Sequence, residues 1–66
     1  MIDFSELVKT RREALGMTRR EVADKALCSI STMLSLEHYK RMIRMDILQD
    51  ILNVLGLEIV VREVKR

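Results

Sequence analysis

The stretch Thr18–Glu37, TRREVADKALCSISTMLSLE, decides the fold of this 66-residue chain. Thr18 is a favourable helix N-cap, and Glu21 follows three residues later, which is the T-x-x-E pattern of a capping box. A second start signal comes at Ser29, only a few residues after the first helical pattern ends at Ala26. The spacing therefore predicts two short helices that are joined by a tight turn.

A connection of about three residues is too short for the two helices to lie antiparallel, so we expect them to cross at roughly 90–120°. The first helix is expected over Thr18–Ala26 and the second over Ser29–Glu37. Val22, Met33 and Leu36 are expected to face the core. In a helix-turn-helix, the second helix is the one that enters the major groove of DNA. The same pair of helices also occurs as a plain corner of a helical bundle, and this alternative stays open here.

The length indicates one domain, and a domain of this size buries only about 60% of the surface of its unfolded chain. Dimerisation is a common way for so small a domain to gain stability. The absence of Pro and the abundance of Leu, Ile, Val, Met, Lys, Arg and Glu are typical of a mostly helical protein. The single Cys28 excludes an intramolecular disulfide and suits a reducing, cytoplasmic setting. No apolar run approaches the roughly 18 residues of a membrane span, so no membrane partner is expected.

Further helices are expected on both sides of the central pair. The first is predicted over Met1–Leu15, with Asp3 as its N-cap and Gly16 at its end. The last is predicted over Met45–Leu55 and is stopped by Gly56. The apolar stripes expected to face the core are Phe4, Leu7, Val8, Arg11 and Leu15 on the first helix and Met45, Leu48, Ile51, Leu52 and Leu55 on the last.

The segment His38–Arg44 carries basic residues and no helix cap, so it is expected to be a loop with Met42 and Ile43 tucked beneath it. The helix that follows has a second apolar edge, at Ile47 and Val54, which exceeds what one small core needs and suggests a partner surface. The methionines expected to fill the core are Met17, Met33, Met42 and Met45.

The segment Leu57–Val64, LEIVVREV, is rich in β-branched residues and partly alternating, which is typical of a strand. A single strand leaves its backbone N–H and C=O groups unpaired. Pairing with the same strand of a second copy about a two-fold axis satisfies them, so we expect a homodimer; a helical extension or a frayed tail is the alternative. The expected dimer interface comprises Ile47, Val54, Leu57, Ile59, Val60 and Val61.

The net charge is modest, +2 from twelve basic and ten acidic residues, and the total alone does not mark a nucleic-acid binder. The placement of the basic residues is more informative, because they flank the central helix pair on both sides. The flanking residues are Arg11, Arg12, Arg19, Arg20, Lys40, Arg41 and Arg44, whereas Arg62, Lys65 and Arg66 read as ordinary solvated charges.

The segments LVKTRREALGMTRREVADKALCSISTMLSLEHYKR and ILQDILNVLGLEI resemble the lambda-repressor/Cro-like helix-turn-helix family, also called the XRE family. The resemblance covers residues 5–58 and rests on RREALGMT, EVADKA, S-x-S-T-M, Leu36-Glu37 and NVLGLE. It implies an all-α fold in which a four-helix DNA-binding domain over residues 1–56 is followed by a dimerisation strand and tail over residues 57–66. The part after LGLE resembles antitoxin-type members that dimerise through such a strand.

The resemblance also implies roles for individual residues. Arg12 and Glu37 match an ion pair that ties the first helix to the end of the third, which makes Glu37 structural rather than catalytic. The positions that read bases are Ile30, Ser31, Thr32 and Ser35. The resemblance and the basic residues that flank the motif together predict the positions that contact DNA phosphates. These are Thr18, Arg19, Arg20, Ser29, Lys40, Arg41 and Arg44.

The sequence departs from the family pattern at its turns. Leu27 and Tyr39 stand where the family usually has Gly, Ile43 stands where it usually has Pro, and Arg19 replaces a common Gln. A non-Gly residue in the left-handed conformation costs about 1 kcal/mol or more. We therefore expect these turns either to carry that cost or to adopt another geometry.

No catalytic arrangement is present: the sequence has no Gly-rich phosphate loop, no nucleophile with a plausible base and no paired carboxylates in a likely cleft. One Cys and one His cannot form a zinc site. We therefore expect no enzymatic activity, metal or cofactor. The sequence instead predicts a dimeric repressor that binds double-stranded DNA and is cytoplasmic, and nucleoid-associated when it is bound to DNA. Its pseudo-palindromic operator is expected to have half-sites about 34 Å apart. The alternatives are an antitoxin that neutralises a partner toxin and autoregulates its operon, and an interaction module that has lost DNA binding.

Overall fold

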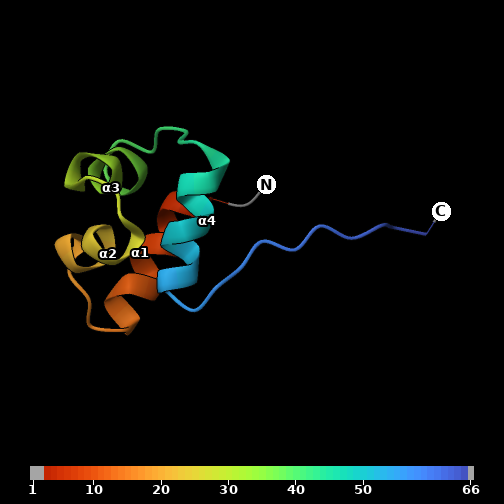
Figure 1. The fold of residues 1–66 in the computed structure, drawn as a ribbon, viewed down its shortest axis with the longest axis horizontal. Helices are drawn as coiled ribbons and strands as arrows, with labels where there is room; N and C mark the ends of the chain where they lie inside the picture. Colours follow the sequence, from red (N-terminus) through yellow and green to blue (C-terminus); the bar gives the residue numbers. More distant parts are fainter. Residues whose placement is uncertain (1–2, 66) are drawn as a thin grey trace.

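Four α-helices make up the body of the protein in the computed structural model, which describes residues 3–65. They are α1 (Phe4–Ala14), α2 (Arg19–Ala26), α3 (Ile30–Glu37) and α4 (Met45–Val54). α2 packs against both α3 and α4, and α1 packs against α3, while the end of the chain leaves the helices and runs outward (Figure 1). The predicted all-α, four-helix domain is confirmed; Met1 and Ile2, which were expected to begin the first helix, lie outside the described residues.

Side-chain caps begin the first three helices. The Asp3 carboxylate accepts hydrogen bonds from the backbone amides of Ser5 and Glu6. At α2, Thr18 Oγ1 accepts from the Glu21 amide over 3.1 Å and the Glu21 carboxylate accepts from the Thr18 amide over 3.0 Å, so the predicted capping box is complete. The Ser5 hydroxyl also donates to Asp3, and this bond together with the Glu6 amide stabilises the charged carboxylate and lowers the pKa of Asp3. The bonds between Thr18 and Glu21 lower the pKa of Glu21 in the same way. At α3, Ser29 Oγ accepts from the Thr32 amide over 3.1 Å.

The core lies where the helices meet, and its largest fully buried side chains come from all four helices and the end of α4. Burying each such side chain contributes about 1.5–3 kcal/mol, which makes this cluster the main source of stability. The fully buried residues are Val8, Val22, Met33, Ile51, Leu52 and Leu55.

Some residues predicted to face the core are exposed. The buried line of α1 follows Ser5, Val8 and Arg12, so Leu7 lies on its flank and is 39% exposed. Leu15 lies past the last turn of α1, as its C-cap, and is 45% exposed. Arg11 is also exposed, with its Nε donating to the Leu55 carbonyl over 2.9 Å. The stripe prediction failed at these positions because it assumed a wider contact face than α1 has.

The loop after α3 corrects the prediction for two methionines. Met42 was expected to tuck beneath the loop, and this prediction was wrong, because its side chain is 99% exposed. Met45, in the first turn of α4, is 60% exposed, because the buried face of α4 begins one turn later, at Leu48. Ile43 is half-buried and packs on the core, and Met17 does the same at the turn before α2.

Two non-glycine residues adopt the left-handed conformation at the turns. Leu27, the C-cap of α2, has φ 57° and ψ 40°, so the turn before α3 takes the geometry that favours Gly. After α3 the strained residue is Lys40, with φ 54°, rather than Tyr39. The predicted free-energy cost of the left-handed conformation is therefore borne by Leu27 in the first turn. In the second turn it is borne by Lys40, one residue later than the family pattern suggests.

The segment that follows α4 forms no strand within residues 57–65. Leu57 and Ile59 are half-buried against the core, whereas Val60, Val61 and Val64 are 69%, 92% and 74% exposed. A single chain offers this segment no neighbouring strand, so its backbone has no ladder to join. The predicted pairing across a dimer stays a prediction.

Candidate nucleic-acid interface

α3 packs against α1 and α2 with one face and leaves the start of the helix at the surface. Met33, Leu36 and Glu37 form the buried face of α3. The predicted base-reading residues lie outside that buried set: Ile30 and Ser31 are exposed, and Thr32 and Ser35 are half-buried. α3 therefore presents short polar side chains together with two apolar ones, the exposed Ile30 and the half-buried Leu34.

The amino end of α3 is held rigidly by its cap. Ser29 Oγ lies 3.0 Å from Thr32 Oγ1 in addition to accepting from the Thr32 amide. Two hydroxyls predicted to contact DNA therefore already bind each other in the free chain. Ser31 and Ser35 make no such side-chain bond among the described residues.

A buried ion pair joins α1 to the end of α3. Arg12 Nε and Nη2 donate to the two oxygens of the Glu37 carboxylate over 2.8 and 2.9 Å, and Arg12 Nη1 donates to the Met17 carbonyl over 2.8 Å. The Glu37 side chain is fully buried and that of Arg12 is 11% exposed. The hydrogen bonds to Glu37 raise the pKa of Arg12. The structure thus brings together the two residues that the resemblance paired.

Glu37 also binds a second arginine, which sequence reasoning did not find. Arg19, the first residue of α2, donates from Nε to Glu37 Oε1 over 3.2 Å. The resemblance assigned Arg19 to a DNA phosphate alone, because the usual Gln at this position gave no sign of a charge partner. One signal in the sequence could have indicated this bond. Arg19 is a cation where the family usually has a neutral Gln, and the acidic Glu37 lies at the end of the following helix.

Most of the predicted phosphate-contacting residues fall into two groups. The first surrounds a shallow depression of about 450 Å³ at the start of α2, where Thr18, Arg19 and Arg20 lie beside Ile30. Lys9, to which the sequence gave no role, borders the same depression. The second group, Lys40, Arg41 and Arg44, lies in the loop after α3 and is exposed.

The loop group contains contacts that the sequence did not suggest. The Arg41 guanidinium carbon lies 5.4 Å from the centre of the Tyr39 ring, and Tyr39 meets His38 edge-on at 4.8 Å. The Arg41 amide donates to the Ser35 carbonyl over 2.8 Å, which ties this loop to α3. Arg44 instead donates to the Asp46 carboxylate over 2.9 Å at the exposed start of α4. Exposed pairs of this kind contribute little to stability, so Arg44 remains available to other anions.

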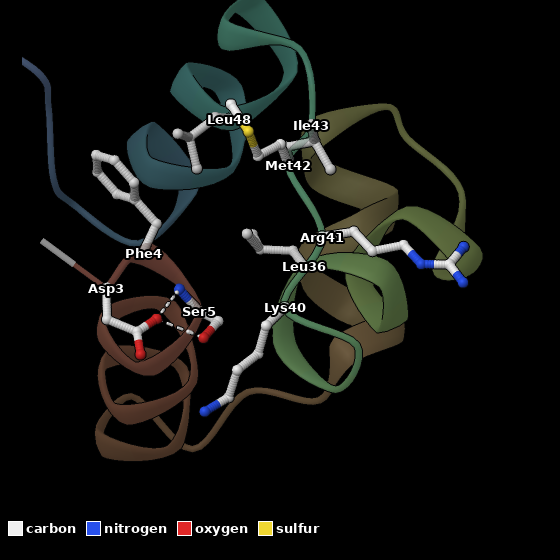
Figure 2. A pocket seen from close by; sticks show the side chains of 9 residues that line it. All are labelled: Asp3, Phe4, Ser5, Leu36, Lys40, Arg41, Met42, Ile43 and Leu48. Carbon is white, nitrogen blue, oxygen red and sulfur yellow. Dashed lines mark hydrogen bonds between the residues drawn. The ribbon is translucent and has the colours of Figure 1, made fainter.

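A cavity of about 460 Å³ lies beneath the same loop, between the start of α1, the end of α3 and the start of α4 (Figure 2). Its apolar lining is Phe4, Leu36, Ile43 and Leu48, and the exposed Met42 borders its mouth. The polar groups at its edge are Lys40, Arg41 and the Asp3 carboxylate, which is already occupied by the cap of α1. The cavity holds no arrangement of groups suited to acid–base or nucleophilic chemistry.

Metal chemistry finds no support in the described residues. Over residues 3–65 no three His, Cys, Asp or Glu side chains gather in a way that would hold a metal ion. Burial raises the pKa of the half-buried Cys28 thiol, which keeps it protonated near neutral pH. None of the helices in this part of the chain is long and apolar enough to cross a membrane.

The arrangement of two short helices, a left-handed turn and flanking basic side chains defines a helix-turn-helix protein. A family model for Helix-turn-helix proteins matches residues 8–61. The chain belongs to this family, in its lambda-repressor-like or XRE branch, and is a DNA-binding transcription regulator. Comparisons with curated proteins and with solved structures found no match.

Proposed function

We propose that this protein is a dimeric repressor that occupies a pseudo-palindromic operator through the major groove. The observation that carries the proposal is the capped α3, whose exposed face lies beside the basic residues at the start of α2 and in the following loop. Phosphate contacts position such a helix, and contacts to base edges supply specificity. The phosphate contacts are Thr18, Arg19, Arg20, Ser29, Lys40, Arg41 and Arg44, and the base-reading residues are Ile30, Ser31, Thr32 and Ser35.

Base reading in this scheme has a limited reach. Ile30 offers only an apolar contact, suited to a thymine methyl group, and Ser31 and Ser35 are short. The specificity of the repressor therefore depends in part on bridging water and on DNA shape.

Dimerisation places two such helices in successive major grooves. In this proposal residues 57–66 form the dimerisation segment, with Leu57, Ile59, Val60 and Val61 meeting the same residues of a second copy. Three exposed valines on a segment that forms no strand within residues 57–65 support this role. Ile47 and Val54 on α4 are half-buried and extend the apolar surface beside it.

A DNase I footprint on the DNA upstream of the protein's own gene tests the proposal. At near-physiological salt, we expect one protected site with two-fold symmetry, and we expect protection to disappear when the site is scrambled. Salt-sensitive, continuous protection without a discrete site would instead indicate charge-driven binding and contradict a specific repressor.

An antitoxin role is the second candidate. The exposed Met42 and Met45 give the body an apolar surface outside the C-terminal segment, and a partner toxin is one protein that would cover it. Coexpression with the product of the adjacent gene distinguishes the two roles. A stable complex that suppresses toxicity supports the antitoxin, and the absence of any complex supports the repressor.

The remaining hypothesis is that the chain is a protein-interaction module that has lost DNA binding. It is tested by replacing both Arg19 and Lys40 with Ala. We expect a large loss of DNA affinity at moderate salt, because two phosphate contacts disappear. Unchanged affinity would contradict the phosphate assignment.

A further inference from the structure

We propose that the buried Glu37 is a positioning residue for DNA binding, because it orients the guanidinium of Arg19 toward a DNA phosphate. The inference rests on the proposed function and adds to it a residue that DNA cannot reach. It begins from a carboxylate with a fully buried side chain that two arginines share.

The two arginines use their nitrogens differently. All three guanidinium nitrogens of Arg12 donate within the protein, two to Glu37 and one to the Met17 carbonyl. Arg19 donates to Glu37 only through Nε, and no acceptor for its Nη1 and Nη2 groups is found among residues 3–65. Arg12 is therefore committed to the fold, whereas Arg19 keeps the outer side of its fork for another anion.

The charges of the cluster favour an anion at the same place. Two guanidinium groups and one carboxylate give the Arg12–Glu37–Arg19 cluster a charge of +1, and the other charged residues around the depression, Lys9, Glu13 and Arg20, add a further +1. Arg12 and Glu37 are shielded, but the Arg19 side chain is 35% exposed. The uncompensated charge is therefore presented at the surface by Arg19, beside Thr18 and Arg20 in the shallow depression.

The bond also relates the phosphate contact to the recognition helix. Arg19 is the first residue of α2, and Glu37 is the last residue of α3. A phosphate held by Arg19 Nη groups would lie at a set position relative to α3, because the Nε–Glu37 bond restricts the guanidinium. Positioning of this kind determines which base edges the helix meets.

Lysine and methionine at position 19 separate positioning from mere charge. Arg19→Lys keeps the charge but cannot bind Glu37 and a phosphate with one planar fork, whereas Arg19→Met also removes the charge. Both variants keep the Arg12–Glu37 pair, so the domain is expected to fold. Arg62→Lys and Arg62→Met are the controls, because Arg62 is an exposed arginine to which the proposed function gives no DNA contact.

The affinity of each variant is measured over a series of salt concentrations. The probes are a duplex copied from the DNA upstream of the protein's own gene and a scrambled duplex of equal length. Arg19→Lys is expected to keep the salt slope and to weaken binding to the upstream duplex roughly five- to tenfold. Arg19→Met is expected to weaken it further and to reduce the slope by about 0.9, the value of one phosphate contact. Arg62→Lys is expected to bind like the wild type.

The outcomes separate the two hypotheses. An Arg19→Lys protein that binds as tightly as the wild type would overturn the positioning role of Glu37, and an unchanged slope for Arg19→Met would overturn the phosphate contact. Equal losses for the two variants with an unchanged slope would show a purely structural residue. A wild-type protein that prefers neither duplex would overturn the proposed sequence-specific function, while the salt slopes on either duplex would still report on Arg19.

Discussion

The α2–α3 unit and the C-terminal segment differ in how far their polar groups find partners and their apolar side chains are buried within one chain. In the unit, Thr18 and Ser29 cap the helices, and the buried Glu37 is paired with two arginines. Across residues 3–65 no buried side-chain nitrogen or oxygen lacks a partner. The segment 57–65, by contrast, exposes apolar side chains and has no backbone ladder. The difference teaches that the body satisfies its polar groups within one copy, whereas the segment leaves its apolar side chains exposed, as the proposed dimer requires.

The largest effect is expected from Glu37→Ala, which tests whether the Glu37 ion pairs stabilise the four-helix body. Removing this carboxylate leaves the buried Arg12 without its partner, so we expect a loss of about 3–5 kcal/mol in the free energy of unfolding. Domains of this kind have little stability to spare, and much of the protein should be unfolded at room temperature. Urea titration followed by helical circular dichroism measures the loss.

The matched control for Glu37→Ala comes from the other region. Glu58→Ala removes an exposed carboxylate from the C-terminal segment and should change stability by less than about 0.5 kcal/mol. Similar effects for the two variants would mean that the Glu37 cluster does not hold the body together.

The dependence of the C-terminal segment on a partner is tested by Val61→Asp. Val61 is 92% exposed in the single chain, so the folded monomer should keep its helices. In the proposed dimer the new charge would be buried, and we expect the dimer dissociation constant to rise ten- to hundredfold, about 1.4–2.8 kcal/mol. Sedimentation equilibrium measures it, with Arg62→Gln as the control. A wild-type protein that stays monomeric at high concentration would refute the proposed dimer.

The same contrast explains which parts of the fold were predictable from the sequence. Helix starts depend on local chemistry, so Thr18, Glu21 and Ser29 located α2 and α3 to within one residue. The C-terminal segment has strand-like residues, but a strand also needs a neighbour, and sequence pattern does not say where that neighbour lies.

The candidate site was predictable in composition more than in geometry. The family pattern supplied Arg12 and Glu37 as a pair, and the structure brings them within 2.8 Å. The bond from Arg19 depends on how α2 meets the end of α3, which no local spacing encodes. The exposure of Met42 is of the same kind, because it depends on the path of the loop rather than on the residue's hydrophobicity.

A smaller effect is expected at the turn that joins α2 to α3. Leu27 is 92% exposed and has a φ of 57°, so its side chain gains little packing and bears the left-handed cost. We expect Leu27→Gly to stabilise the body by about 1 kcal/mol, raising the melting temperature by roughly 4–8 °C. Thermal unfolding followed by circular dichroism measures the change. Lys25→Gly, inside α2, is the control and should destabilise by about 1 kcal/mol. Destabilisation by both would show that the turn is not strained.

The smallest expected effect concerns the cap of α1 at acid pH. Hydrogen bonds from the Ser5 side chain and the Glu6 amide lower the pKa of Asp3 below 3.8, so the folded state holds its charged form more strongly than the unfolded chain does. The contribution is therefore present above the unfolded pKa and is lost as the pH falls through the lower, folded value. Asp3→Asn keeps a capping oxygen but cannot titrate.

The stability of Asp3→Asn should consequently fall less steeply than that of the wild type as the pH is lowered from about 5 to 2. Urea midpoints measured across this range give the comparison. Glu63→Gln, in the exposed C-terminal segment, is the control and should follow the wild-type profile, because no cap bond in the described chain holds that carboxylate. If Asp3→Asn also ran parallel to the wild type, the acid sensitivity of the body would have to come from its other carboxylates, with the Thr18–Glu21 capping box the next to test.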